Sequence, residues 1–362
     1  MKERMKMYKI LDMGEATSLG EGRAVSGVRA ALLKDGRYIT IINTTSGGVT
    51  NDFTPLVAYS DDGIHYGECK PLFPEYIGKK SIYVSVRNTE DGGISICGFS
   101  INIDKEGEEW WDDPHCAIKE NQLVYTLSDD GYHIPPLKFL DLPYYGAAEI
   151  PGGMQVDKDG TMTIVYSPYS VIEAKEATDT NCLVRMISQD GGETWESSKI
   201  ACVEGKSLYA ETWIVTLPDG ARLVSTWQTA NETAPDQYLY AKDGVTFGNV
   251  APLPFKGQST SLLALKDGRV LIPYNQRKEE PIGVWMAVTK PNENGLNMTE
   301  NAPVWNTESG NKTGDDTSFS GWTTFSFGEP QVIERPDGTF LLILWFSKGD
   351  IGGGRYIHFA IE

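Results

Sequence analysis

Three carboxylates stand where predicted β-strands begin, and they are the residues of this chain best suited to chemistry. Glu211 lies between Tyr209 and Trp213 on an otherwise apolar stretch, where an isolated carboxylate is costly unless it has partners or a task. Asp52 and Glu329 likewise precede apolar, strand-like segments. Two such carboxylates can act as proton donor and nucleophile at a glycosidic bond. The alternatives are a surface glutamate at a strand edge for Glu211 and a turn-capping loop residue for Asp52.

A unit made of an apolar run, an Asp-Gly pair and a second apolar run recurs along the chain, and each copy predicts a β-hairpin. The Asp-Gly pairs fall at six places, one of them in a weaker unit that ends at Gly92: Asp35-Gly36, Asp91-Gly92, Asp159-Gly160, Asp219-Gly220, Asp267-Gly268 and Asp337-Gly338. Asp-Gly favours the primed turns, whose twist matches that of two paired strands. Hairpins about fifty residues apart predict a repeat architecture.

A second repeat lies between these hairpins. It reads Ser-Gln-Asp-Gly-Gly-Glu-Thr-Trp at residues 188–195, and looser copies occur at residues 60–66, 128–133 and 242–247. Ser188 and Asp190 can hydrogen-bond the backbone of a tight turn, and Trp195 can pack beneath that turn as an anchor. We expect each copy to form the outer hairpin of one repeated unit.

Together the two repeats predict an all-β fold, a six-bladed β-propeller of four-stranded antiparallel blades. The whole chain, residues 1–362, is expected to form this single domain, because no long helical periodicity and no Pro/Ser-rich linker interrupts the pattern. The last blade, residues 325–361, is expected to be completed by a strand from residues 6–13. Such a closure locks the ring.

Composition and charge limit the partners of this protein. A net charge of −18 disfavours nucleic acids and strongly anionic polymers, which bind basic surfaces. The four histidines lack metal-ligand spacing, and the five cysteines are dispersed without a Cys-x-x-Cys pair, which favours reduced core thiols. The glycines form neither a phosphate loop nor a dinucleotide fingerprint. We therefore expect no cofactor and no metal.

The first residues, 1–13, are charged and include no apolar stretch of signal-peptide length, and no segment is long enough to cross a membrane. This pattern predicts a cytoplasmic protein that does not contact membranes, unless a leader has been removed. The sequence gives no indication of the oligomeric state.

The segment at residues 188–195 resembles the Asp-box of the sialidase superfamily, whose members are β-propellers. The resemblance extends to segments that carry the active site of that superfamily. Arg29, in Val-Arg-Ala-Ala-Leu-Leu, resembles an arginine that binds the substrate, and Asp52 resembles the general acid/base that follows it. Glu211, in Glu-Thr-Trp-Ile-Val-Thr-Leu-Pro-Asp-Gly, resembles a glutamate that helps to activate the nucleophile.

Two departures from the sialidase pattern bear on the substrate. Sialidases hold a substrate carboxylate with three arginines, but Ser225-Thr226-Trp227-Gln228 stands at the second position, and Arg277 comes too early for the third. Glu329 stands where their tyrosine nucleophile is expected. A glutamate can attack a sugar whose anomeric carbon bears no carboxylate, because no like charge repels it. Both departures imply a sugar that is not a sialic acid.

The resemblance and the residues together predict an exo-acting glycoside hydrolase with an oligosaccharide or glycoside as its substrate. Asp52 or Glu211 would protonate the leaving oxygen, and Glu329 would attack the anomeric carbon or activate water. The alternatives are a non-catalytic carbohydrate-binding propeller, a polysaccharide lyase and a true sialidase.

Further residues could bind the sugar. Glu149, before a Gly-rich turn, is a reserve carboxylate. Aromatic rings near inner-strand ends could stack on sugar faces, although most rings in a propeller pack between blades. The aromatic candidates are Tyr209, Trp213, Trp227 and Tyr274.

Overall fold

The computed structural model describes residues 8–19, 22–112, 114–202, 209–228, 234–277, 279–307, 326–348 and 351–361, without the side chains of residues 202, 209, 228, 259 and 351. In this part of the chain the secondary structure consists of β-strands and one short 3-10 helix, η1 (Pro74–Tyr76). The predicted all-β fold is therefore confirmed. No helix described is long and apolar enough to cross a membrane.

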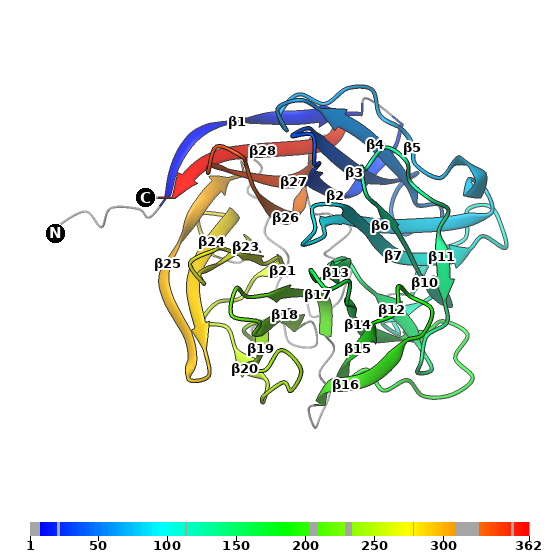
Figure 1. Cartoon of the computed structure of the whole chain (residues 1–362). Helices are drawn as coiled ribbons and strands as arrows, with labels where there is room; N and C mark the ends of the chain where they lie inside the picture. The colour runs from blue at the N-terminus through cyan, green and yellow to red at the C-terminus, as the bar shows by residue number, and fades with distance from the viewer. Residues whose placement is uncertain are drawn as a thin grey trace.

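The sheets radiate from a common axis, which is the propeller arrangement that the repeats predict (Figure 1). Four sheets contain four antiparallel strands, as expected for a blade. The first is β2 (Ala24–Leu32), β3 (Tyr38–Thr45), β4 (Thr54–Ser60) and β5 (Lys70–Pro71), and the second is β6 (Lys80–Asn88), β7 (Ile94–Asn102), β10 (Asn121–Ser128) and β11 (Lys138–Leu140). The other two are β17 (Tyr209–Thr216), β18 (Arg222–Gln228), β19 (Gln237–Ala241) and β20 (Ala251–Pro252), and then β26 (Phe327–Glu334), β27 (Phe340–Lys348), β28 (Ile351–Ile361) and β1 (Tyr8–Ser18).

Two further sheets depart from the predicted four-stranded pattern because their first strand is divided. One contains five strands, β21 (Gln258–Thr260), β22 (Leu263–Ala264), β23 (Val270–Gln276), β24 (Gly283–Asn292) and β25 (Gly295–Asn306). The other contains seven, β12 (Ala147–Glu149), β13 (Met154–Val156), β14 (Met162–Val171), β15 (Cys182–Ser188) and β16 (Glu196–Cys202), with β8 (Trp111–Asp112) and β9 (Ala117–Ile118) added through a parallel pairing to β14. Pro151, which has no N–H to donate, lies in the gap between β12 and β13.

The six Asp-Gly pairs form the predicted turns between first and second strands, but not in the predicted conformation. Gly36 has a φ of 88°, whereas Asp35 is not among the non-glycine residues with positive φ, so the turn is not primed. The Gly36 N–H donates to the Leu33 carbonyl at 2.9 Å, and the Leu33 N–H donates to the Arg37 carbonyl at 2.7 Å. This is a type I turn followed by a left-handed glycine, which also suits the twist of a hairpin.

The outer turns connect third and fourth strands, as predicted. In the turn after β15, the Asp190 carboxylate accepts hydrogen bonds from the Thr194 N–H at 3.0 Å and the Thr194 hydroxyl at 2.6 Å. The Ser188 hydroxyl donates to the same carboxylate at 2.8 Å. Trp195 packs under this turn with its ring edge toward that of Tyr125.

In two of the looser copies, a histidine takes the place of Thr194. His65 Nδ1 lies 2.7 Å from the Asp62 carboxylate, and His133 Nδ1 lies 2.6 Å from the Asp130 carboxylate. Among the cysteines whose side chains are described, Cys69, Cys97, Cys116 and Cys182 form no disulfide bond. That finding agrees with dispersed, reduced cysteines.

The ring is closed as predicted, by an N-terminal strand in the sheet of the last hairpin. β1 pairs antiparallel with β28 from Tyr8 opposite Ile361 to Ser18 opposite Gly353, and the two strands run side by side in Figure 1. The two ends of the chain therefore complete one sheet.

Buried polar side chains join each sheet to the next near the axis. The contacts, in ring order, are Asn43 Nδ2 to the Val84 carbonyl at 2.9 Å, Ser85 Oγ to the Pro151 carbonyl at 2.5 Å, Ser167 Oγ with Thr212 Oγ1 at 3.1 Å, Ser225 Oγ with Thr260 Oγ1 at 2.9 Å, Ser261 Oγ to the Pro330 carbonyl at 2.7 Å, and Arg29 Nη1 to the Glu329 carbonyl at 2.5 Å. Short polar side chains of this kind let adjacent sheets approach closely while their polar atoms stay paired.

The contact between His133 and Asp130 predicts that His133 keeps its proton to a higher pH than an ordinary histidine. The carboxylate raises the pKa of His133 above its ordinary value of 6.5, whereas desolvation lowers the pKa of His358. Because the pKa of His133 is raised on folding, its contribution to stability is fully present below the unfolded value and is lost as pH rises through the folded one. We expect NMR titration to place His133 above 6.5 and His358 below it. His133→Thr identifies the His133 resonance, and its threonine can donate to Asp130 as Thr194 donates to Asp190. A pKa of His133 below 6.5 would contradict the contact with Asp130.

Candidate active site

Inner strand ends from around the ring surround a cavity of about 280 Å³. Three carboxylates on its wall come from separate sheets: Glu149 at the end of β12, Glu211 in β17 and Glu329 in β26. The rest of the wall is rich in aromatic residues, namely Phe53, Tyr83, Phe99, Trp110, Trp111, Tyr169, Trp227 and Trp345. A few convergent polar groups in a concave aromatic wall are typical of a small-ligand site.

Two of these carboxylates stand on strained backbone. Glu211 has a φ of 50° and Glu329 a φ of 51°, and the only other non-glycine residue described with a positive φ is Cys116. Both glutamates lie at irregularities in strand pairing, between Ala210 and Trp213 in β17 and between Gly328 and Gln331 in β26. A bulge re-aims a side chain, and left-handed non-glycine residues cluster at functional sites. Glu211 and Glu329 therefore share the same local geometry, in which a distortion of the inner strand orients the carboxylate.

The Glu329 carboxylate has a different partner for each oxygen. The Tyr83 hydroxyl donates a very short hydrogen bond to Oε1, and Arg29 Nη1 lies 3.3 Å from Oε2. Burial raises the pKa of Glu329, while Arg29, Tyr83 and Arg277 oppose that rise. The negative charge of Glu329 is thus supported by two arginines and a phenol, whereas the Glu211 N–H is the one cause that lowers the pKa of Glu149.

Glu149 and Glu211 are directly connected. The Glu211 backbone N–H donates to Glu149 Oε2 at 2.7 Å. Burial, followed by repulsion from Glu211, raises the pKa of Glu149 well above its ordinary value. A carboxyl group in this setting holds its proton to higher pH, which is the property of a general acid.

Arg29 and Trp213 are not among the residues that line the cavity, so they are not placed to contact a sugar there. The Trp213 ring lies between two guanidinium groups, 5.4 Å from that of Arg29 and 4.7 Å from that of Arg87. Arg87 donates to the carbonyls of Gly152 at 3.1 Å and Ile214 at 2.8 Å, and burial lowers its pKa to about 10. Arg29 and Arg87 come from β2 and β6 and meet Trp213 of β17 from across the ring. These three side chains therefore connect β2, β6 and β17.

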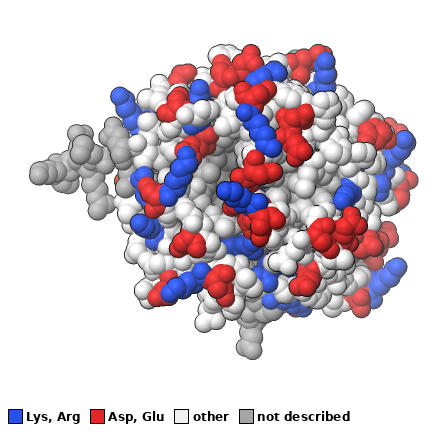
Figure 2. Space-filling model, viewed as in Figure 1, with Lys and Arg blue, Asp and Glu red and all other residues white. Residues whose placement is uncertain are grey.

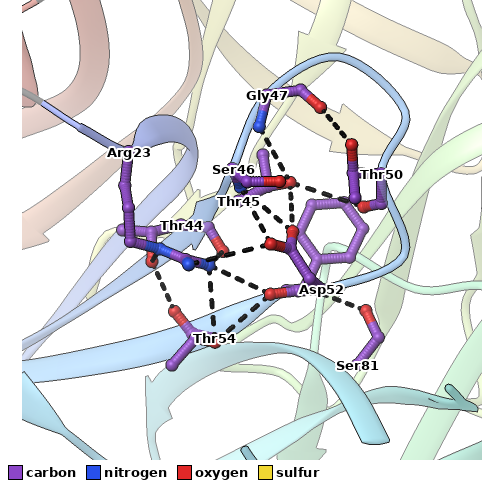
Figure 3. Close-up of polar contacts among 10 residues, drawn as sticks. Arg23, Thr44, Thr45, Ser46, Gly47, Thr50, Asp52, Thr54 and Ser81 are labelled. Atoms are coloured by element: carbon purple, nitrogen blue, oxygen red, sulfur yellow. Dashed lines mark hydrogen bonds and ion pairs between the residues drawn. The ribbon is translucent and has the colours of Figure 1, made fainter. Parts of the chain in front are cut away.

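Asp52 is also placed differently from the sequence-based expectation, since its carboxylate serves the loop that follows β3 (Figure 3). Oδ1 accepts hydrogen bonds from Thr45 Oγ1 at 2.7 Å and the Ser46 N–H at 3.0 Å, and Arg23 lies 3.7 Å from Oδ2. The next residue, Phe53, is the one that reaches the cavity wall. Asp52 therefore acts in this structure as a turn-capping residue.

The aromatic candidates divide between cavity and core. Trp227 lines the cavity as expected, with Lys256 Nζ 5.7 Å from its ring. Tyr274 is 1% exposed, stacks on Phe255 with ring centres 4.0 Å apart, and belongs to the core between sheets. The side chain of Tyr209 lies outside the described part of the chain.

Arg277 and Tyr83 reach the cavity although sequence reasoning did not select them as site residues. Arg277 comes too early in the sequence to match the third sialidase arginine, yet it lines the wall and donates to Gln258 Oε1 at 3.3 Å and to the Phe327 carbonyl. Tyr83 belongs to the weakest of the predicted hairpins, and its place in the first strand of that hairpin, β6, is the one signal that the sequence offers. Within the described ranges, no group of three or more His, Cys, Asp and Glu could hold a metal ion.

Sequence comparison matches this chain to no family model and to no curated protein. Comparison with solved structures finds a similar fold in a protein of unknown function from Dyadobacter fermentans, with a TM-score of 0.74 and 16% identity over 98% of this chain and 99% of that one. A mutant of the NanB sialidase from Streptococcus pneumoniae gives a TM-score of 0.67 and 13% identity over 96% of this chain and 70% of that one. The intramolecular trans-sialidase from Ruminococcus gnavus gives 0.61 and 13% over 97% of each chain. At such identities the comparisons show the fold alone, a sialidase-like propeller.

The positive φ of Glu211 and Glu329 predicts an inverted order of stability between glycine and alanine. Glu211→Gly and Glu329→Gly should each exceed the matching alanine variant in free energy of unfolding by about 1 kcal/mol, because glycine adopts a left-handed conformation without steric cost. Urea unfolding measures the difference. Glu149, which has no positive φ, is the control position, and there alanine should be the more stable. Alanine variants at 211 and 329 that match or exceed the glycine variants would contradict the strain.

Proposed function

We propose that the protein is an exo-acting glycoside hydrolase whose substrate sugar bears no carboxylate on its anomeric carbon. The observation that carries this proposal is the meeting of Glu149, Glu211 and Glu329 on one aromatic-lined cavity. Hydrolysis of a glycoside needs one carboxyl group that holds a proton and one carboxylate that holds a charge. Glu149 is suited to hold the proton, because burial and the neighbouring charge of Glu211 raise its pKa. Glu329 is suited to hold the negative charge, because Arg29 opposes the rise in its pKa that burial causes.

The reaction can be assigned to these residues step by step. A Glu329 oxygen attacks the anomeric carbon as the glycosidic C–O bond breaks, and Glu149 gives its proton to the departing oxygen. Water then adds to the anomeric carbon of the glycosyl-enzyme, giving a proton back to Glu149 and releasing Glu329. Glu149 thus takes the role that sequence reasoning gave to Asp52 or Glu211, because Asp52 is held in its loop. Glu211 fixes the orientation of Glu149 through its backbone N–H.

The size of the cavity supports exo action. A volume of about 280 Å³ accommodates roughly one sugar ring, since drug-sized ligands need pockets of about 300 Å³ or more. The side chains of Arg29, Trp213 and Arg87 also meet one another between β2, β6 and β17, which disfavours passage of a chain through the ring. The substrate would therefore enter by its terminal residue.

The charges on the wall disfavour an anionic sugar. Among the described residues that line the cavity, three carboxylates face a single guanidinium, that of Arg277, and Arg277 already donates to Gln258 and Phe327. The structural neighbours include a trans-sialidase in complex with oseltamivir carboxylate, so an acidic ligand is bound by a protein of the same fold. Strong binding of a carboxylate by bidentate arginines is not supported here.

A non-catalytic carbohydrate-binding propeller is the second candidate, favoured by the aromatic wall. Trp110, Trp111, Trp227 and Trp345 offer rings on which sugar faces can stack without any reaction. Turnover separates the two candidates.

A panel of aryl glycosides tests the proposed activity. We expect hydrolysis of at least one glycoside that has no carboxylate on its anomeric carbon, and no efficient hydrolysis of a sialoside. Glu329→Ala should lower turnover by about 1,000-fold or more, and azide or formate should restore part of it with inverted configuration, because the small anion fills the vacated space. Efficient cleavage of the sialoside, or full activity of Glu329→Ala, would refute the proposal.

The role of Glu149 predicts a dependence on the leaving group. Glu149→Gln should lose most activity on glycosides with basic leaving groups and much less on activated aryl glycosides, because only the former need a proton. Since the pKa of Glu149 is raised, the wild-type rate should fall only as pH rises through that elevated pKa, and the variant should lack this alkaline limb. Asp52→Asn is the matched control and should keep the limb. If the alkaline limb were lost in Asp52→Asn but kept in Glu149→Gln, the general acid would be Asp52 and not Glu149.

A further inference from the structure

Tyr83 makes a contact that the proposed reaction does not yet use. Its hydroxyl donates to Glu329 Oε1, although the two residues are far apart in sequence and belong to different sheets. The ring is 7% exposed and cannot turn easily, because it stacks on Phe99 with centres 5.5 Å apart and meets Phe53 edge to face at 5.4 Å. The donor is therefore held in place by packing that does not involve Glu329.

Gly27 provides the space for this contact. A Cβ at residue 27 would lie 2.3 Å from Tyr83 Oη and 2.6 Å from Glu329 Oε2, so any side chain there would force the two apart. Gly27 is not one of the glycines with positive φ, and its backbone could be adopted by other residues. The reason for glycine at this position is thus the close approach of Tyr83 and Glu329.

We propose that Tyr83 is a positioning residue that orients the Glu329 carboxylate for attack. The inference rests on the proposed function for its chemical meaning, but the contact itself can be tested without a substrate. Tyr83 keeps its proton, because burial and the neighbouring Glu329 raise its pKa well above the ordinary value of 10. It can therefore donate a hydrogen bond to Glu329 throughout the neutral range.

The other charged groups around Glu329 determine in which direction its pKa shifts when the Tyr83 hydroxyl is removed. Arg29 of β2 and Arg277 beyond β23 stabilise the Glu329 carboxylate, while Glu149 lies close enough to feel its charge. Besides burial, the charge of Glu211 of β17 contributes to the raised pKa of Tyr83. With these groups unchanged, loss of the Tyr83 hydroxyl removes one stabilising contact from the carboxylate and so raises the pKa of Glu329.

Tyr83→Phe is the direct test, because it keeps the stacked ring and removes only the hydroxyl. We expect carboxyl-carbon NMR of protein with labelled glutamate to show Glu329, identified by Glu329→Gln, titrating at higher pH in Tyr83→Phe than in the wild type. Gly27→Ala should shift the same resonance in the same direction while the hydroxyl is retained. Tyr125→Phe is the matched control: it removes a buried hydroxyl that donates to the Gly192 carbonyl at 3.3 Å, and it should leave the resonance unchanged.

Kinetics supply the second readout once a cleaved glycoside is known. Tyr83→Phe should lower kcat by about 10- to 100-fold with little change in KM, as expected for loss of a hydrogen bond to a charged group, and should move the acidic limb of the pH profile upward. An unchanged Glu329 titration in Tyr83→Phe would overturn the inference whether or not any glycoside is cleaved. Covalent labelling of Tyr83, and not Glu329, by a fluorinated glycoside would also overturn it, because Tyr83 would then be the nucleophile.

Discussion

The site depends on the buried hydrogen bonds that join each sheet to its neighbour beside the axis. Side chains such as Asn43, Ser85 and Ser167 are almost fully buried, and a polar group in that position is costly unless it is paired. Each contact is satisfied only when adjacent inner strands sit at one height relative to each other. These contacts therefore fix where every inner strand end lies, and hence where the cavity forms.

The same contacts hold the strained glutamates. The Glu329 carbonyl accepts from Arg29, and Thr212, which follows Glu211 directly, meets both Ser167 and Thr226 through its hydroxyl. A residue in the left-handed region persists only where its surroundings over-determine it. The two bulges are thus anchored by the ring itself, and the carboxylates gain an orientation that a regular strand would not give them.

The charges on the molecule are distributed differently outside and inside. Figure 2 shows acidic and basic side chains interspersed over one face, in a chain whose net charge is −18. In the cavity, three carboxylates are gathered among aromatic rings, and burial lifts the pKa of Glu149 and Glu329. The surface charge favours solubility, while the buried charges create the contrast in protonation that acid-base chemistry requires.

The repeats in the sequence were sufficient to predict the propeller, because Asp-Gly turns and Ser-x-Asp turns place strands by local rules. They could not predict which side chain of a strand faces the cavity. Asn275 lines the cavity, whereas Tyr274 beside it points into the core, and Phe53 reaches the wall in place of Asp52. Side chains alternate along a strand, so an error of one residue exchanges wall and core, and a bulge reverses the alternation again.

The pairing of β1 with β28 in one sheet has a consequence for how the protein folds during its synthesis. The ribosome makes residue 8 long before residue 361, yet these two residues lie opposite each other in one ladder. The earlier sheets can form in order as they emerge, because each is continuous or nearly continuous in the chain. β1 cannot form this pairing until β28 has been made, and the ring closes only then.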